Sequence, residues 1–518
     1  MQKDIKIEMK QEWLPSKYAD YLGVEYSNSV SKEHKKTNGQ FFSPTEISDF
    51  MGKASTNRNL SEISILDPGC GTGILTCSLI ENLINEKTRI IRLVAYETDF
   101  SLFNYTEKSL QYLKKWLNNR NIEFTYLLFA NDFIVDMAKS FQNTREKFDY
   151  IISNPPYFKL PKNDKRVLLL QNVVNVQPNI YSLFMVVSVN LLKENGEMIF
   201  ITPRSFASGQ YFNSFRDYFF KNVNIELIHL FKTRNKTFNR DKVLQELLII
   251  KATKQKNNKT VISTSEGLND ISKPIVKHIR IENIINLNTK DKTLFLPTTE
   301  KEIEIINLFK SWKNRLIDYG IQVSTGRVVA FRNKQHLYSI YRNTTVFLAP
   351  LYWLHNVNKM KINWPLLDIN KSQYINITNE TKSILLPNKN YIFLRRFSTK
   401  DDKSRLICAP YFATNNQTEY IGVENKLNYI YKINSNFDNE EMVGIATLLN
   451  SDIYDTYFRT FNGNINVSAT EIRLMTFPST DKIKQIGEAI IRTNDFSQNN
   501  INKITNSILI SKNIIVNV

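Results

Sequence analysis

The chain has little cysteine and little histidine: its 518 residues include 3 Cys and 5 His. Three cysteines cannot form a disulfide framework, and none of them stands in a metal-ligand cluster. We therefore expect no metal site and a reducing, cytoplasmic location. The scattered histidines also disfavour a structural zinc and a histidine-based catalytic triad.

Long apolar runs are missing as well. The richest stretch, Leu183 to Leu192, is interrupted by Ser188 and Asn190, and a membrane span needs roughly 18 or more apolar residues. The N-terminus lacks the apolar core of a signal peptide. Gly and Pro, 15 of each, are too few for collagen-like or low-complexity proteins. The sequence predicts a globular chain of two to four domains with no membrane partner.

Acidic residues are outnumbered by basic ones. Lys and Arg total 68 against 50 Asp and Glu, a formal charge of +18, so a polyanion is the first candidate partner. The excess is +7 in residues 1–255 and +11 in residues 256–518. Between 310 and 405 there are 17 basic and 5 acidic residues. This uneven distribution points to the second half as the polyanion-binding part.

Alternating strand and helix patterns fill residues 63–250, which is typical of a mostly parallel α/β sheet. We expect strands at 63–67, 90–96, 124–130, 148–153, 197–202 and 243–250, and helices at 74–83, 102–116 and 180–192. The basic, polar segment 251–260 is expected to be a linker or exposed loop. Beyond it the pattern is irregular, and residues 300–308 form the clearest helix. We divide the chain into an N-terminal extension (1–35), a catalytic domain (36–255) and a second domain (256–518).

A glycine-rich turn follows the first expected strand. Asp67 to Gly73 reads Asp-Pro-Gly-Cys-Gly-Thr-Gly, and its glycines allow a tight turn and close approach to a ligand. It is not a dinucleotide fingerprint, because position 74 is Ile. The turn looks like the cofactor loop of S-adenosylmethionine (AdoMet) methyltransferases.

Acidic residues follow the next two strands. Glu97 is placed to accept hydrogen bonds from ribose hydroxyls. Asp132 either accepts from the adenine amine of a cofactor or caps a helix. Because ligands of open α/β sheets bind outside the carboxyl ends of the strands, we expect these side chains to share one crevice with the glycine turn.

The fourth strand ends in Asn154-Pro-Pro-Tyr157. An amine on a conjugated ring is a poor nucleophile, because its lone pair is delocalised. The Asn154 side-chain oxygen and the Pro155 carbonyl can accept its hydrogens, while the prolines stiffen the loop and Tyr157 stacks on the ring. Catalysis would rest on positioning and electrostatics, with no covalent intermediate.

Together these motifs resemble the gamma-class N6-adenine DNA methyltransferases. The segment Gly39 to Pro44 resembles the N-terminal element of that class, with Ser43 where the family usually has Thr. The resemblance implies AdoMet contacts at Ser43, Asp67, Cys70, Gly71, Thr72, Gly73, Glu97, Asp132 and Pro156. It implies catalysis by Asn154, Pro155, Pro156 and Tyr157, with Tyr157 and Phe238 packing against the target adenine.

The resemblance extends into the second half, where Val323 to Val329, Tyr391 to Arg396 and Ile421 to Tyr429 look like modification enzymes of the PstI/BsuBI type. The implied fold is a Rossmann-like methyltransferase domain with a mostly parallel seven-stranded sheet, followed by an α+β target-recognition domain. The implied function is N6 methylation of a flipped adenine in double-stranded DNA within a type II restriction–modification system, with a separately encoded endonuclease as a possible partner.

Basic residues interleaved with aromatics in the second half suit DNA contacts. The candidates are Arg327, Arg332, Lys334, Arg395 and Arg396. Arginines of this kind either read guanine in the major groove or contact phosphate, which carries no sequence information.

Three other functions remain open. Asn-Pro-Pro-Tyr also serves protein-glutamine and RNA methyltransferases, which are usually shorter. A bifunctional restriction–modification enzyme would need magnesium-binding acids, and Glu424-Asn-Lys426 lacks a preceding Pro-Asp element. The intact motifs at 67–73 and 154–157 disfavour a non-catalytic DNA-binding subunit.

Overall fold

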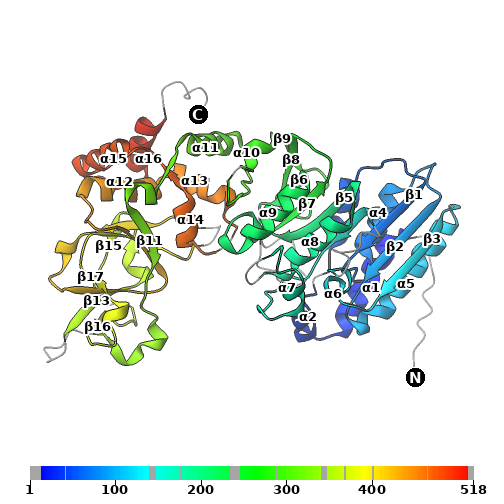
Figure 1. The fold of residues 1–518 in the computed structure, drawn as a ribbon, viewed down its shortest axis with the longest axis horizontal. Coiled ribbons are helices and arrows are strands. Elements are labelled where there is room, and N and C mark those ends of the chain that lie inside the picture. Colours follow the sequence, from blue (N-terminus) through cyan, green and yellow to red (C-terminus); the bar gives the residue numbers. More distant parts are fainter. Residues whose placement is uncertain are drawn as a thin grey trace. The chain divides into compact units, whose positions relative to one another are not determined.

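The computed structural model divides the chain into two compact units, Met1–Thr298 and Thr299–Val518. It describes residues 13–40, 42–138, 147–174, 178–233, 246–287, 289–339, 347–366, 369–398, 402–463 and 465–510. Figure 1 labels helices and strands of both units. Within the described residues, no helix has both the length and the apolarity needed to cross a membrane.

The first unit is built on one nine-stranded sheet with the order β3-β2-β1-β4-β5-β7-β6-β8-β9. Its strands are β1 (Glu62–Asp67), β2 (Ile90–Tyr96), β3 (Glu123–Phe129), β4 (Phe148–Ser153), β5 (Leu192–Pro203), β6 (Asn224–Phe231), β7 (Leu247–Thr253), β8 (Lys259–Ser265) and β9 (Ile275–Arg280). The strands β3, β2, β1, β4 and β5 run parallel, and β7 is antiparallel to both of its neighbours. The order reverses between β1 and β4, which is where ligands bind in open α/β sheets.

The α/β pattern of this unit is confirmed, with two corrections. The sheet has nine strands instead of seven, because β8 pairs with β6 and β9 pairs with β8. Within the predicted linker 251–260, only residues 254–258 lie outside the strands β7 and β8. The first compact unit of the structure runs from Met1 to Thr298. Polar composition marked the connection correctly but could not show that strands resume after it.

Helices flank this sheet (Figure 1). They include α1 (Pro15–Ser29), α2 (Lys32–Asn38), α3 (Thr45–Ala54), α4 (Ile74–Leu83), α5 (Phe100–Asn118), α6 (Phe133–Met137), α7 (Lys165–Leu169), α8 (Ile180–Leu191) and α9 (Asn213–Asn222). Helix α1 buries Ala19, Leu22 and Tyr26 and packs against α4 and α5. The described part of the expected N-terminal extension therefore belongs to the first unit.

The second unit contains two larger sheets. The antiparallel one has the order β11-β21-β18-β19 and the mixed one β12-β16-β13-β20-β17. Their strands are β11 (Ile321–Thr325), β12 (Leu337–Tyr338), β13 (Leu348–Tyr352), β16 (Tyr374–Asn376), β17 (Leu386–Pro387), β18 (Tyr391–Arg395), β19 (Cys408–Tyr411), β20 (Tyr420–Val423) and β21 (Leu427–Lys432). Aromatic side chains dominate the core between them, including Tyr352, Tyr391, Phe393, Tyr411 and Tyr429.

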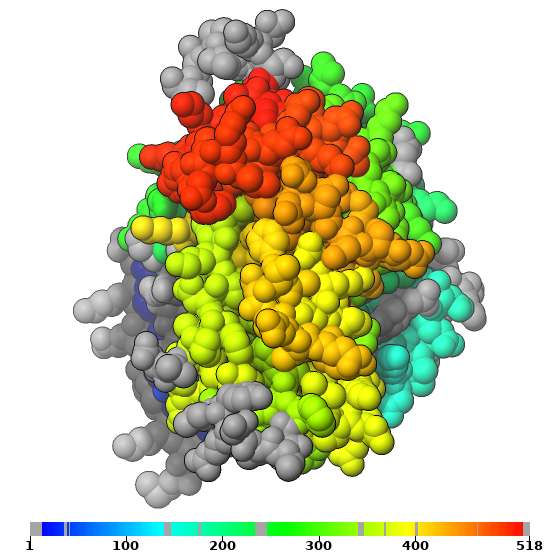
Figure 2. All heavy atoms as spheres, turned by 90° about the vertical axis from the view of Figure 1, so that its left-hand side faces the viewer, coloured from blue at the N-terminus to red at the C-terminus, as the bar shows by residue number. Residues whose placement is uncertain are grey.

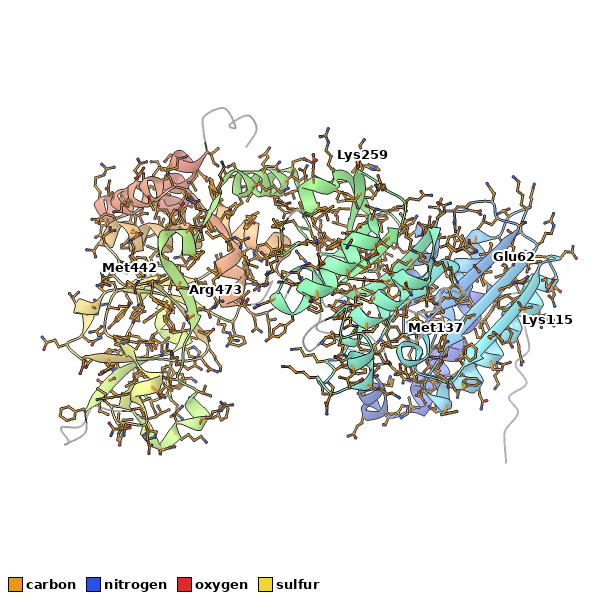
Figure 3. The ribbon with its side chains drawn as sticks, in the orientation of Figure 1. Glu62, Lys115, Met137, Lys259, Met442 and Arg473 are labelled. Carbon is orange, nitrogen blue, oxygen red and sulfur yellow. The ribbon has the colours of Figure 1, made fainter. Side chains whose placement is uncertain are left out.

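Well-formed helices complete the second unit, in addition to the one that the sequence made clearest at 300–308. They are α11 (Glu300–Ser311), α12 (Asn439–Asn450), α13 (Asp452–Phe461), α14 (Ala469–Leu474), α15 (Thr480–Thr493) and α16 (Gln498–Leu509). Helix α12, which carries Met442 in Figure 3, packs tightly on α15. A Cβ on Gly444 would lie 2.0 Å from the Ile483 carbonyl oxygen, and one on Gly487 would lie 1.9 Å from that of Glu440. The two glycines therefore let the helix backbones meet.

Candidate functional site

A cavity of about 360 Å³ lies at the carboxyl ends of β1, β2, β3 and β4, the edge opposite to Glu62 at the start of β1 (Figure 3). The predicted cofactor and catalytic residues that line it are Ser43, Cys70, Gly71, Thr72, Glu97, Asp132, Asn154 and Pro156. The four strand ends therefore share one site, as their positions in the sequence predicted.

The glycine turn wraps the start of α4. The Cys70 amide donates to the Tyr96 carbonyl oxygen at 2.9 Å, and the Gly73 amide to the Cys70 carbonyl oxygen at 2.8 Å. Gly71 and Gly73 have φ angles of 55° and 81°, the left-handed region that glycine adopts without strain. The turn thereby places the N-terminus of α4, capped at Gly73, beside the cavity.

Asp67 is the last residue of β1 and binds the helix that follows this turn. The carboxyl group is fully buried and accepts a 2.7 Å hydrogen bond from the Thr76 hydroxyl. Burial raises the pKa of Asp67 to about 7, and the negative charge of Glu97 adds to the shift. Asp67 is not among the residues that line the cavity, so the observed contact is with α4.

Both carboxylate oxygens of Glu97 are held by backbone amides. One accepts from Gly71 at 3.2 Å and the other from Asp99 at 2.8 Å. Burial raises the pKa of Glu97 to about 7. The carboxyl is thus fixed between the glycine turn and the start of α5, facing the cavity.

Asp99 joins the N-terminal helices to the cavity wall. One oxygen lies 2.6 Å from the Tyr26 hydroxyl, 2.6 Å from His34 Nε2 and 2.7 Å from Gln40 Nε2. The other accepts from the amide and hydroxyl of Ser101 at 2.9 and 2.6 Å. These hydrogen bonds hold the pKa of Asp99 well below its usual range, although burial opposes them.

Sequence reasoning missed Asp99, although Asp99 and Ser101 form a recognisable helix cap. The partners on α1, on α2 and just after α2 could not be identified from the sequence, because they lie 59 to 73 residues away along the chain. Gln40 also lines the cavity, so this network shapes the site directly.

Asp132 both caps a helix and forms an ion pair. One oxygen accepts from the Val135 amide at 3.0 Å, which makes Asp132 the N-cap of α6. The other lies 3.3 Å from Arg166 Nη1. Arg166 also binds Asp164 at 2.8 and 2.6 Å and lies over the Phe158 ring. Arg166 and Phe158 line the cavity, and neither was predicted.

Asn154 is held from both sides. Its amide nitrogen donates to Ser43 Oγ at 3.1 Å, and its oxygen accepts from the Tyr157 hydroxyl at 2.5 Å. That hydroxyl also lies 2.9 Å from the Ile201 carbonyl oxygen on β5. Burial raises the pKa of Tyr157 well above its ordinary value, so the hydroxyl stays protonated.

The Tyr157 ring is buried, with 8% of its surface exposed. It packs edge-on against Tyr181, with ring centroids 6.3 Å apart. Pro155 is also buried, while Pro156 lines the cavity. Phe238, the second predicted partner of a target base, lies outside the described residues.

In the second unit, the predicted DNA-contacting residues lie in the loop after β11, in two short 3₁₀ helices and at the end of β18. Arg327 and Lys334 are exposed, and Arg332 lies over the ring of Phe331, which is 70% exposed. The two remaining residues, Arg395 and Arg396, are partly buried, at the end of β18 and directly after it.

Comparison with known proteins places the chain among restriction–modification methylases. Residues 75–238 match the model of the Eco57I restriction-modification methylase family. Over 490 residues the chain is 30% identical to the type II methyltransferase M.PstI of Providencia stuartii, covering 94% of this chain and 96% of that protein. Over 466 residues it is 32% identical to the type II methyltransferase M.BsuBI of Bacillus subtilis, covering 89% and 91%.

Among solved structures, the type IIL restriction-modification enzyme MmeI in complex with DNA has a similar fold. The TM-score is 0.54 at 12% sequence identity, covering 95% of this chain and 73% of MmeI.

Proposed function

The chain belongs to the type II DNA methyltransferases of restriction–modification systems, and from that premise we propose that it methylates the N6 amine of an adenine in double-stranded DNA. AdoMet is the proposed methyl donor. The observation that carries the proposal is the position of Asn154, which lines the same cavity as Glu97 and the glycine turn. An amide oxygen at that edge is placed to accept a hydrogen from an amine beside the cofactor.

The cavity residues fit AdoMet by their chemistry. The Glu97 carboxylate suits the ribose hydroxyls, and the positive φ of Gly71 lets the backbone approach a ligand. Phe133, Phe158 and Phe184 line the cavity and offer apolar surface to an adenine ring. When bound, AdoMet supplies an electrophilic methyl group on a sulfonium. The cation would be favoured by the nearby carboxylates of Glu97 and Asp67.

The side chains of the loop position the target amine. Asn154 Oδ1 can accept from the amine while it accepts from Tyr157, because an amide oxygen has two lone pairs. The Ser43 and Tyr157 contacts fix the orientation of the Asn154 amide. A Pro155 carbonyl accepting the second amine hydrogen would complete the proposed site. Attack needs no protein nucleophile, so positioning supplies the catalysis.

Access to the amine requires that the base leave the duplex, at a cost of roughly a few kcal/mol. In this proposal Tyr157 and Phe238 pack against the extruded adenine, and Arg327, Arg332, Lys334, Arg395 and Arg396 contact the duplex. The buried Tyr157 ring would have to present a face to the base, which a small movement of the loop could provide. A separately encoded endonuclease is the proposed functional partner.

Duplex DNA methylated by the purified chain with labelled AdoMet, then digested to nucleosides, tests the proposal. We expect N6-methyladenine in the wild-type reaction and none with Asn154→Ala. Label in RNA or in a protein glutamine, with none in duplex DNA, would favour the two other methyltransferase readings. Cleavage of unmethylated DNA with magnesium would indicate a bifunctional enzyme.

A further inference from the structure

The second unit contains a group of basic side chains with few acidic neighbours. We name it the cationic cluster: Lys371, Arg395, Arg396 and Lys426. Backbone contacts bring three of these residues together. The Arg396 amide donates to the Lys426 carbonyl oxygen at 3.0 Å, and Arg395 on β18 pairs with Leu427 on β21. Figure 2 shows the second unit from one side, with the chain near residues 400–430 (yellow) below the C-terminal helices (red).

The pKa values of two neighbouring side chains, His355 and Glu424, are shifted by the charges of the cluster. Burial, and then the positive charges of Lys371, Arg395 and Lys426, lower the pKa of His355. Burial raises the pKa of Glu424, against the opposing effect of Lys426, Lys371 and Arg396. The four cations therefore act together on the same small region.

Both arginines are anchored by neutral oxygens. Arg395 donates from Nε to the Val357 carbonyl oxygen at 2.6 Å and from Nη2 to Asn358 Oδ1 at 3.2 Å. Arg396 donates from Nη1 to the Asn425 carbonyl oxygen at 3.0 Å. Such bonds fix a guanidinium without neutralising it.

Two acidic groups, Glu424 and Asp402, lie near the four cations, so the cluster keeps an excess of positive charge. Glu424 is 3% exposed, and its raised pKa shows that burial disfavours its ionised form. Asp402 attracts Arg395, but burial outweighs that attraction and lowers the pKa of Arg395. Holding four like charges together is unfavourable, so the arrangement suits an external polyanion.

The anchoring also decides how the arginines can contact DNA. A bidentate contact to guanine needs two N–H groups of one guanidinium directed at O6 and N7. Arg396 has Nη1 bonded, and its Nε is buried with no partner within the described residues. Arg395 has two of its three nitrogens bonded. Contacts that use Nε are therefore excluded for both arginines, whereas the N–H groups that remain on the terminal nitrogens can bond to phosphate oxygens.

We propose that the cationic cluster is a phosphate clamp that holds the DNA backbone without reading its sequence. The proposal rests on the proposed function, since it takes duplex DNA as the substrate. It makes Lys371 and Lys426, which sequence reasoning did not select, equal partners of Arg395 and Arg396. It also implies that base discrimination lies with other residues of the second unit.

Two sets of variants in the full-length chain separate a clamp from a reader. Lys371→Gln with Lys426→Gln removes two charges, and the matched control Lys482→Gln removes an exposed charge on α15. Arg396→Lys keeps the charge but removes bidentate geometry. Affinity for methylatable and unrelated duplexes is measured over a range of salt concentrations. The methylatable duplex is obtained from sites that the wild-type chain modifies.

For the lysine pair we expect the same fold loss of affinity on both duplexes. The slope of log affinity against log salt should shrink by about 2, roughly one unit per lost contact, while Lys482→Gln changes neither. For Arg396→Lys we expect affinity and sequence preference close to wild type.

Several results would overturn the clamp. One is a loss confined to the methylatable duplex in either set, since that indicates base reading. Another is an unchanged affinity and slope in the lysine pair while the wild-type chain binds and methylates DNA, which leaves the proposed function intact. A wild-type chain that binds no duplex would overturn both proposals.

Discussion

The two units treat their charged side chains differently. In the first unit, several ionic groups beside the cavity are matched: Asp99 is surrounded by donors, and Asp132 and Asp164 share Arg166. In the cationic cluster of the second unit, guanidinium groups are held by neutral oxygens. Matched charges stabilise one shape of a cavity, whereas unmatched cations retain their attraction for an anion outside the protein. Variants of each unit can test whether this difference in charge corresponds to cofactor binding by the first unit and DNA binding by the second.

The largest effect is expected at the cavity. Asn154→Ala removes the oxygen proposed to accept the target amine, and removal of one such positioned group typically lowers kcat by about 10²–10³-fold. AdoMet and DNA affinities should stay near wild type, because neither depends on this acceptor. Steady-state kinetics with calorimetric AdoMet binding measures both, with the exposed Asn222→Ala on α9 as the control. An equal loss of AdoMet binding would give Asn154 a structural role instead.

The next effect concerns the N-terminal helices. Asp99→Asn preserves the shape of the side chain but removes the charge that Tyr26, His34 and Gln40 share. Hydrogen bonds to charged groups contribute about 1.5–3 kcal/mol, so the Kd for AdoMet should rise by roughly tenfold or more. DNA affinity and kcat at saturating AdoMet should change little. Tyr26→Phe, which removes one donor, should give a smaller effect in the same direction; parallel losses of kcat would contradict this separation.

Stability of the second unit should be separable from cofactor binding. Gly487→Ala places a methyl group 1.9 Å from the Glu440 carbonyl oxygen, which forces α12 and α15 apart. Overpacking of this kind typically costs about 1–3 kcal/mol. We expect earlier thermal unfolding and weaker DNA binding, with AdoMet affinity retained. The exposed Glu488→Ala on the same helix should leave Tm unchanged, and a loss of AdoMet affinity in Gly487→Ala would show that the units are coupled.

The same contrast explains what the sequence could predict. Residues at the ends of β1, β2 and β4 were found because a parallel sheet brings its carboxyl ends to one edge, so local motifs determine a shared location. Asp99 and Arg166 were missed because each has a partner far away in the sequence: Tyr26 lies 73 residues from Asp99, and Asp132 lies 34 residues from Arg166. In the second unit, sequence reasoning selected Arg395 by composition alone. Its partner Val357 lies in a two-residue strand and the neighbouring Lys371 in a loop, and their placement beside Arg395 depends on the whole fold.

A dependence on pH should also belong to the first unit alone. Burial raises the pKa of both Asp67 and Glu97 to about 7, and a cationic cofactor favours their ionised forms. AdoMet affinity should therefore rise as pH increases through about 7 and then level off, by at most about tenfold per pH unit for each group. Without cofactor the sign reverses, since the folded carboxyls bind protons more tightly than the unfolded ones.

The free energy of unfolding of the cofactor-free chain should accordingly fall as pH rises through the same range. Thermal unfolding with and without AdoMet measures both trends. Glu97→Gln should weaken the pH dependence of both AdoMet affinity and the free energy of unfolding, because Asp67 is then the one remaining carboxyl of this pair. An AdoMet affinity that does not change with pH would mean that neither carboxyl senses the cofactor.

The smallest expected effect tests how the loop holds its amide. Tyr157→Phe keeps the ring but removes the hydroxyl that donates to Asn154 Oδ1 and lies near the Ile201 carbonyl oxygen. If Tyr157 acted only by stacking on the target base, the Tyr157→Phe variant would have the wild-type kcat. The observed bond predicts a loss of about 0.5–1.5 kcal/mol, or roughly twofold to tenfold in kcat, because the Asn154 amide then loses one of the contacts that orient it. Tyr157→Ala should lose more, since stacking on a base is worth roughly 1–3 kcal/mol.

In the Asn154→Ala background, Tyr157→Phe should have no further effect on kcat, whereas an undiminished effect there would show that the hydroxyl acts on something other than Asn154.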